Sequence, residues 1–123
     1  DGAWDGEQIV SADHVEDSVG APSQDLNAAY GLLWWLNVEG RLLDPLQGVS
    51  PSGGPQEEVV GQMIPGAPED IFTAQGLGGQ VILVDPGSET VVVRLGEGGG
   101  DGPLGGYRAP EAARVVIEAL VDG

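Results

Sequence analysis

The chain of 123 residues contains no cysteine. Disulfide bonds, cysteine-based metal sites and cysteine nucleophiles are therefore excluded, and the redox compartment stays undetermined. Lysine is also missing, so only four arginines face twenty aspartates and glutamates, and the net charge is −16. Such a charge repels phosphate backbones and anionic lipid, so we expect neither nucleic acid nor a membrane as partner. A solvated acidic surface is the simpler explanation of the charge, and recruitment of a basic partner is the alternative.

Long hydrophobic runs are missing as well. The longest strongly apolar run covers residues 31–36, far short of the roughly 20 residues that a membrane helix needs. No basic segment followed by an apolar one opens the chain, so we expect no signal peptide, and the compartment stays open. The first residue is not Met, which leads us to expect a processed or partial product. Apolar residues make up 41% of the chain, enough for one small domain with a modest core.

Residues that commonly carry chemistry are scarce. His14 is the only histidine, and its acidic neighbours suggest a solvated helix face rather than a catalytic triad. The acidic residues are scattered, with no calcium-loop pattern, so we expect no metal. The glycine-rich segment 96–106 lacks the Gly-Lys-Ser/Thr ending of a phosphate loop and is interpreted as a connector. We therefore expect no cofactor.

The elements expected from the pattern give an α+β fold. A short helix over 12–18 should be capped by Ser11, and the apolar segment 29–38 reads as a strand buried on both faces. Segments 79–84 and 90–95, with a turn-rich connection, predict an antiparallel hairpin over 79–95. A helix over 109–122 carries one continuous apolar face, made by Ala113, Val116, Ile117, Leu120 and Val121.

These elements predict a small antiparallel sheet with the C-terminal helix packed on one face. The other face would stay uncovered, which leads us to expect further chain. The proline- and glycine-rich segment 44–70 is a long loop, either a lid or binding loop or a mobile insertion.

Two features suggest a ligand site. Trp34 and Trp35 would point to opposite faces of a strand, so at most one of them, taken here as Trp35, lines a pocket, and core packing is the default for both. Glycines at 76, 78 and 79 directly precede a strongly apolar strand. Glycines at such a place let a ligand approach the backbone, where an N–H at a strand edge can stabilise an oxyanion.

Three segments in chain order carry a family resemblance. They are 2–11, with Trp4-Asp5-Gly6 and Ile9-Val10-Ser11; 29–35, with Tyr30-Gly31 and Trp34-Trp35; and 72–95, with Phe72, Ala74-Gln75-Gly76 and Gly79-Gln80. Together they resemble serine hydrolases of the β-lactamase and penicillin-binding-protein superfamily. The subgroup that the chain resembles is the class C β-lactamase-like esterases and amidases, including 6-aminohexanoate-dimer hydrolases.

The resemblance implies that residues 1–123 are the C-terminal part of such a domain. In this family the serine of Ser-x-x-Lys attacks an ester or amide carbonyl, while the lysine and a tyrosine move protons. All three groups are expected upstream of this chain. The third family motif, usually Lys/His-Thr/Ser-Gly, aligns with Ala74-Gln75-Gly76.

This alignment also implies a site. The Leu77 backbone N–H, directly after Gly76, would be the strand-side donor of the oxyanion hole, and Ala74, Gln75, Gly78 and Trp35 would contact substrate. Ala74 removes the usual cationic or imidazole group, which favours a neutral ester or amide. The implied partners are this small-molecule substrate and the N-terminal part of the hydrolase, in cis or as a separate chain. The alternative is a non-catalytic fragment or subunit that acts as a structural or binding module.

Overall fold

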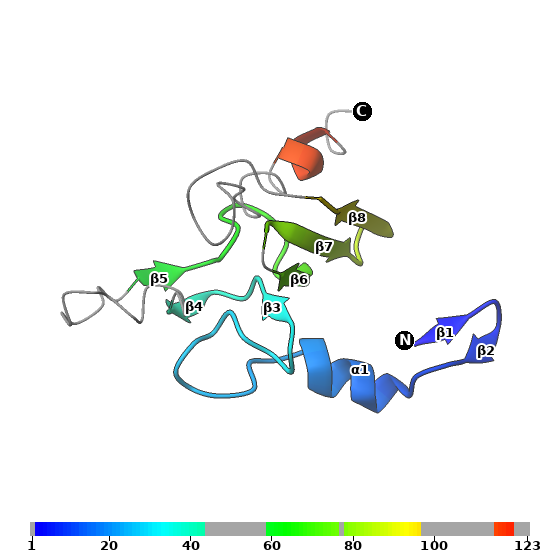
Figure 1. The fold of residues 1–123 in the computed structure, drawn as a ribbon. Helices are drawn as coiled ribbons and strands as arrows, with labels where there is room; N and C mark the ends of the chain where they lie inside the picture. The colour runs from blue at the N-terminus through cyan, green and yellow to red at the C-terminus, as the bar shows by residue number, and fades with distance from the viewer. Residues whose placement is uncertain (1, 44–58, 77, 97–114, 120–123) are drawn as a thin grey trace.

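The structure, a computed structural model, describes residues 2–43, 59–76, 78–96 and 115–119. They form a mixed α+β arrangement in which every strand pair is antiparallel, as predicted (Figure 1). A short helical segment covers residues 115–119. The other elements, in chain order, are β1 Ala3–Trp4, β2 Glu7–Gln8, α1 Ala12–Val19, β3 Trp35–Leu36, β4 Gly40–Leu42, β5 Val59–Gly61, β6 Phe72–Gly76, β7 Gln80–Asp85 and β8 Thr90–Arg94.

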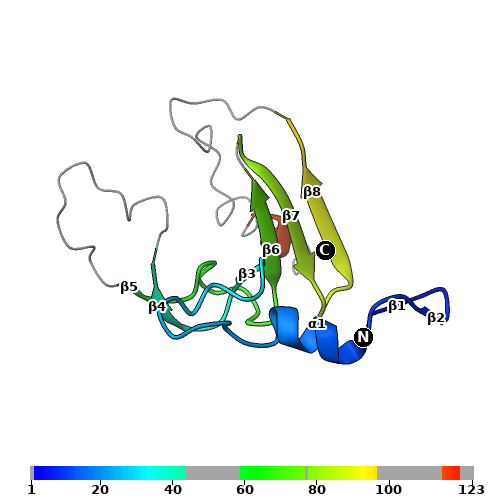
Figure 2. The ribbon, with the colours of Figure 1, turned by 60° about the horizontal axis from the view of Figure 1, so that its bottom comes forward.

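The main sheet has four strands in the order β3-β6-β7-β8. Strands β6, β7 and β8 follow one another in sequence and lie side by side in Figure 2. Their valines, isoleucine and leucine favour extended backbone, because branched side chains pack well on a pleated surface. The predicted hairpin is confirmed, although its strands run over residues 80–85 and 90–94 rather than 79–84 and 90–95.

The turn between β7 and β8 is closed by a carboxylate. Asp85, at the end of β7, accepts hydrogen bonds from the backbone N–H of Gly87 (3.1 Å) and from the Ser88 hydroxyl (2.7 Å). An aspartate that bonds the backbone two residues ahead is a standard turn former. The turn chemistry of residues 85–89 thus accounts for the hairpin.

Two predictions about the sheet are wrong in detail. Segment 29–38 is not one buried strand: only Trp35–Leu36 joins the sheet, after a tight turn closed by the Tyr30–Trp35 bridge and by the Gly31 N–H donating to the Trp34 carbonyl (2.9 Å). The Ser18 carbonyl oxygen lies so close to Gly31 that a side chain there has no room. Conversely, Phe72–Gly76 is itself a strand, β6, which the glycine pattern concealed.

The N-terminal elements follow local chemistry. Asp5 and Gly6 have positive φ angles of 49° and 79°, the conformation of a two-residue hairpin turn between β1 and β2. Helix α1 begins as predicted, because the Ser11 side chain accepts the His14 backbone N–H (3.2 Å), and it ends at Gly20. Figures 1 and 2 both show the β1–β2 hairpin beyond the end of α1, away from the main sheet.

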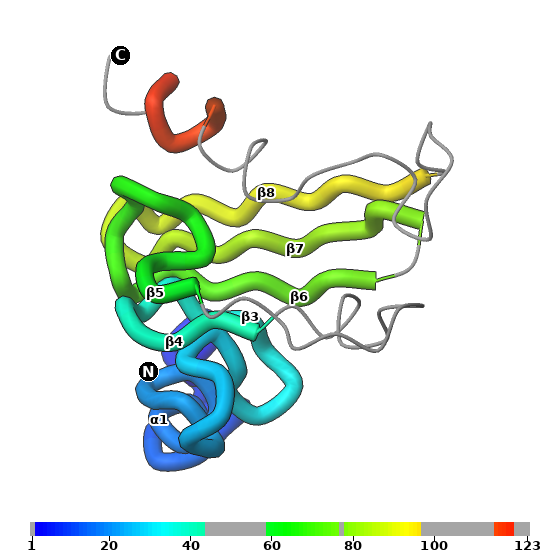
Figure 3. Tube along the Cα trace, turned by 90° about the vertical axis from the view of Figure 1, so that its left-hand side faces the viewer, coloured from blue at the N-terminus to red at the C-terminus, as the bar shows by residue number. Residues whose placement is uncertain are grey.

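The core lies on one face of the main sheet. The connection between β5 and β6 crosses this face (Figure 3) and contributes buried apolar side chains. Within the predicted long loop of residues 44–70, residues 59–61 form β5 and Ile64 and Ala67 are buried, whereas residues 44–58 lie outside the described residues. The buried cluster consists of Ile64, Ala67, Ile71, Val81 and Leu83, with Met63, Val92 and Ile117 packed against it.

A single buried amide fastens this connection to the sheet. Asn37, which follows β3, is 0% exposed. Its Oδ1 accepts the Ile64 backbone N–H (2.7 Å). Its Nδ2 faces the carbonyl oxygens of Ile64 (3.2 Å), Ala67 (3.3 Å) and Pro68 (3.0 Å). Its own backbone N–H donates to the Ile71 carbonyl (3.2 Å), so one residue bonds the connection at four of its residues.

The opposite face of the sheet is open over β7 and β8 among the described residues, whereas near β3 it buries Leu36, which is 1% exposed. Ile82, Val91, Val93 and Leu95 are 39%, 60%, 56% and 74% exposed. The short helical segment lies on the other side, because Ile117 packs against the buried cluster. This arrangement, in which one face of the sheet is covered and the other is left uncovered, was expected from the sequence. Within the predicted helix face, Val116 and Ile117 are half-buried, whereas Ala113, Leu120 and Val121 lie outside the described residues.

Replacing Asn37 by Ala should lower the free energy of unfolding by about 1–3 kcal/mol, because it leaves the buried Ile64 N–H without a partner and removes one hydrogen bond from carbonyls that keep a second donor. Urea unfolding followed by tryptophan fluorescence measures this loss. Gln80→Ala, at an exposed amide on β7, is the matched control and should change stability by less than about 0.5 kcal/mol. Equal stability of Asn37→Ala and wild type would contradict the role given to Asn37.

The helical segment offers a matched pair of sites two positions apart, an exposed valine and a half-buried isoleucine. Ile117→Asp should destabilise the fold by about 2 kcal/mol or more, because it places a carboxylate against the apolar cluster. Val115→Asp, at a side chain that is 58% exposed, should be nearly neutral. Thermal unfolding of the two variants checks this, and the reverse order of melting temperatures would show that the other side of the helix faces the sheet.

Candidate functional site

The candidate site is the edge of β6 that faces β3. Strand β3 reaches only Trp35, opposite Thr73, so no described strand pairs with residues 74–76 on that side. The Asn37 N–H donates to the Ile71 carbonyl, which shows that Ile71 directs its backbone groups toward β3. Because alternate residues of a strand direct their backbone groups to opposite neighbours, Gln75 directs its N–H and C=O to this same edge. Beyond the end of β3, this backbone donor and acceptor thus have no strand partner among the described residues.

The side chain of Gln75 is held by two contacts. Its Nε2 donates to Thr73 Oγ1 (3.0 Å) and to Met63 Sδ (3.6 Å). Thr73 is 1% exposed, and Met63 belongs to the packed connection before β6. The amide is therefore positioned by the core rather than free to rotate.

The two tryptophans separate as predicted. Trp34 packs edge-on against Phe72, with ring centroids 5.1 Å apart, whereas Trp35 packs edge-on against Tyr30 at 5.0 Å. Trp35 lies opposite Thr73 in the register, and directly opposed residues share a face. Trp35 is therefore on the covered face together with Gln75, and it is half-buried.

The glycines after β6 form its turn to β7. Gly78 and Gly79 have φ angles of 79° and 76°, in the left-handed region that favours glycine. Gly76 pairs with Gln80 across the turn. Arg94 donates from Nη1 to the Gly79 carbonyl, which ties the turn to β8. Turn geometry alone thus accounts for Gly78 and Gly79.

Strand register decides which predicted site residues meet. Gln75 lies opposite Val81, and Val81 lies opposite Arg94, so these three form one row on the covered face. Ala74 lies opposite Ile82 and belongs to the open face. The structure thus brings Trp35 and Gln75 to one face and Ala74 to the other, with Gly76 and Gly78 at the turn. Leu77 lies outside the described residues.

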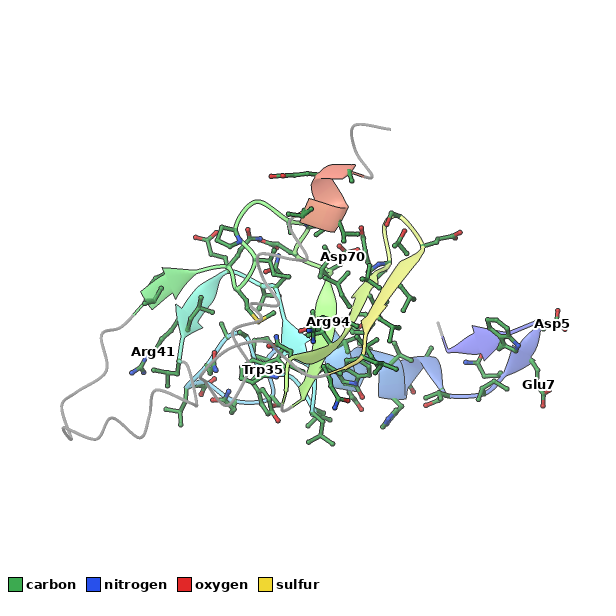
Figure 4. All side chains as sticks on the ribbon, turned by 45° about the horizontal axis from the view of Figure 1, so that its top comes forward. Asp5, Glu7, Trp35, Arg41, Asp70 and Arg94 are labelled. Atoms are coloured by element: carbon green, nitrogen blue, oxygen red, sulfur yellow. The ribbon has the colours of Figure 1, made fainter. Side chains whose placement is uncertain are left out.

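Sequence reasoning missed three residues around this edge. Thr73 and Arg94 could have been found from the two-residue period and the hairpin register, once Phe72–Gly76 is taken as a strand. Met63 carries no local signal, because its position depends on how the long connection folds back. Figure 4 shows Trp35 and Arg94 at the sheet, with Arg41 on β4 and Asp5 and Glu7 out on the β1–β2 hairpin.

Other kinds of site find no support in the described part of the chain. No group of three or more His, Asp or Glu side chains there could hold a metal ion. His14 lies on exposed helix α1. No helix within the described ranges is long and apolar enough to cross a membrane. Comparison with family models, with curated proteins and with solved structures finds no match for this chain.

Proposed function

We propose that this chain is the C-terminal portion of a β-lactamase-like serine hydrolase that cleaves a neutral ester or amide through an acyl-enzyme. The observation that carries the proposal is the edge of β6, where the segment resembling the third family motif has backbone groups that no described strand pairs. A strand edge of this kind suits recognition of a carbonyl group, because its N–H groups are fixed in direction before substrate binds.

The order of elements adds support. The three resembling segments, 2–11, 29–35 and 72–95, stand in the family's order along the chain, and the last of them forms the antiparallel β6–β7–β8 strands. The open face of the sheet suits a chain that continues into further covering elements, since exposed apolar areas of this kind usually mark an interface.

The proposed chemistry is acyl transfer. The serine of Ser-x-x-Lys, outside this chain, gives its proton to the lysine or tyrosine as its oxygen attacks the carbonyl carbon. The carbonyl oxygen becomes an oxyanion, which accepts hydrogen bonds from the serine's own N–H and from the Leu77 N–H. Collapse expels the alcohol or amine, which takes up a proton, and water then hydrolyses the acyl-enzyme.

The substrate is proposed to be neutral near the third motif. Alanine stands at position 74, where the family usually has lysine or histidine, and its side chain belongs to the open face rather than to the face of Gln75. With a net charge of −16, the chain also disfavours anionic substrates by long-range repulsion. Both features favour a neutral ester or amide over a carboxylate-bearing substrate.

The second candidate is a non-catalytic structural or binding module. The exposed apolar face of β7 and β8 favours it, because such a face needs a partner whether or not the assembly is an enzyme. The two candidates differ in whether a nucleophilic serine shares the assembly.

The assignment of Leu77 separates them in the complete protein. Leu77→Ala should keep most activity toward p-nitrophenyl esters, because only the backbone N–H acts, whereas Leu77→Pro should lose about 10²–10³ in kcat. Proline also disturbs strand ends, so both variants need melting temperatures close to wild type. Replacing the residue 77 amide by an ester through semisynthesis removes the N–H alone. Near-normal turnover of that ester variant would refute the donor, and residues 1–123 alone should be inactive.

A further inference from the structure

The orientation of the Gln75 amide is fixed by chemistry rather than by shape. A thioether sulfur accepts hydrogen bonds and cannot donate them. In the structure the nitrogen of the Gln75 amide faces Met63 Sδ at 3.6 Å, the orientation that gives this sulfur a donor. The second hydrogen of Nε2 is directed to Thr73 Oγ1 at 3.0 Å. Both donor positions of the amide are thereby used within the protein.

The carbonyl oxygen of the same amide is left over. None of the described residues donates to Gln75 Oε1, while every buried side-chain polar atom in the described part of the chain has a partner. Oε1 is therefore accessible to solvent, on a half-buried side chain. Among the described residues, Gln75 thus leaves a side-chain acceptor, and no side-chain donor, for a ligand on this face of the sheet.

The surroundings define what such an acceptor can take. Trp35 shares the covered face with Gln75 and lies diagonally across from it in the register, opposite Thr73. A carboxylate on the ligand would meet a carbonyl oxygen, which repels it, within a strongly acidic chain. A group with an N–H or O–H donor would complete the hydrogen bond that Oε1 lacks.

We propose that Gln75 is a specificity-determining residue whose Oε1 accepts a hydrogen bond from a neutral donor, such as a primary amide, on the acyl side of the substrate. This inference rests on the proposed function. It deepens that function by naming the substrate class: acyl groups with a neutral amide or hydroxyl donor, in preference to those with a carboxylate.

Three p-nitrophenyl esters of similar acyl length test this in the complete hydrolase: the succinamate, with a terminal amide; the hemisuccinate, with a carboxylate; and the pentanoate, with a methyl group. The succinamate should exceed both others in kcat/KM by about 5- to 10-fold, the size expected from one hydrogen bond. A hemisuccinate that is as good as the succinamate, or better, would overturn the proposal.

Gln75→Met removes the acceptor and keeps the length and apolar volume of the side chain. Its succinamate-to-pentanoate ratio should fall to within about 2-fold of unity, while pentanoate turnover persists. Gln80→Met is the matched control, because Gln80 is exposed on β7, and it should retain the wild-type ratio. An unchanged ratio in Gln75→Met would show that another group recognises the amide.

A binding measurement keeps this inference distinct from the proposed function. If no ester is hydrolysed, the proposed function fails, and the subsite is judged by the ¹⁵N side-chain amide signals of the same protein. The Gln75 signals are those lost in Gln75→Met. Titration with propionamide should shift them in wild type and titration with propionate should not. Absence of a shift with propionamide, or equal shifts with both, would overturn the subsite.

Discussion

The hydrogen bonds of Asn37 to the connection before β6 are the interaction on which the rest of the structure depends. Its side chain and backbone hold the connection before β6 at four residues, through the Ile64 N–H and the carbonyls of Ile64, Ala67, Pro68 and Ile71. Backbone polar groups that are buried without partners are costly, and Asn37 bonds the Ile64 N–H and adds donors to three carbonyls of this connection. The apolar side chains of the same connection then close the core against β7.

The connection that Asn37 bonds also positions the candidate site. Met63, near the start of this connection, is one of the two residues that hold the Gln75 amide, and Ile71 directly precedes β6. The position of the β6 edge relative to β3 is set at the same place, where the Asn37 N–H meets the Ile71 carbonyl. At the other end of β6, Arg94 holds the turn through Gly79. Strand β6 is thus held at its start by the Asn37 N–H and at its end by the Arg94 side chain, both of which come from outside the strand.

The parts of the fold that could be predicted from the sequence depend on local chemistry. Ser11 as a helix cap, the Asp85 turn and the β7–β8 hairpin each follow from residues within a few positions. The extent of β3 and the existence of β6 could not be predicted in this way. Gly31 is required by the approach of the Ser18 carbonyl, and the glycines of residues 76–79 obscured a strand whose pairing is decided by its neighbours.

The site shows the same division. The motif position of Gln75 could be found from the sequence, but its face, its partners and the direction of its amide come from register and from Met63, which lies 12 positions away in the sequence. Ala74 and Gln75, adjacent in the motif, lie on opposite faces because side chains alternate along a strand. Residues that are adjacent in a strand therefore cannot both contact a substrate through their side chains on one face. Residues two positions apart share a face and can do so.

The central claim is that this sheet edge serves a serine nucleophile contributed from outside the chain. Labelling the complete protein with a fluorophosphonate probe, followed by peptide mass spectrometry, tests it most directly. The account predicts one adduct, on the serine of a Ser-x-x-Lys sequence that lies N-terminal to Asp1, with loss of ester hydrolysis in step with labelling. A folded complete protein that takes no adduct, or that is labelled on a serine of residues 1–123, would contradict it.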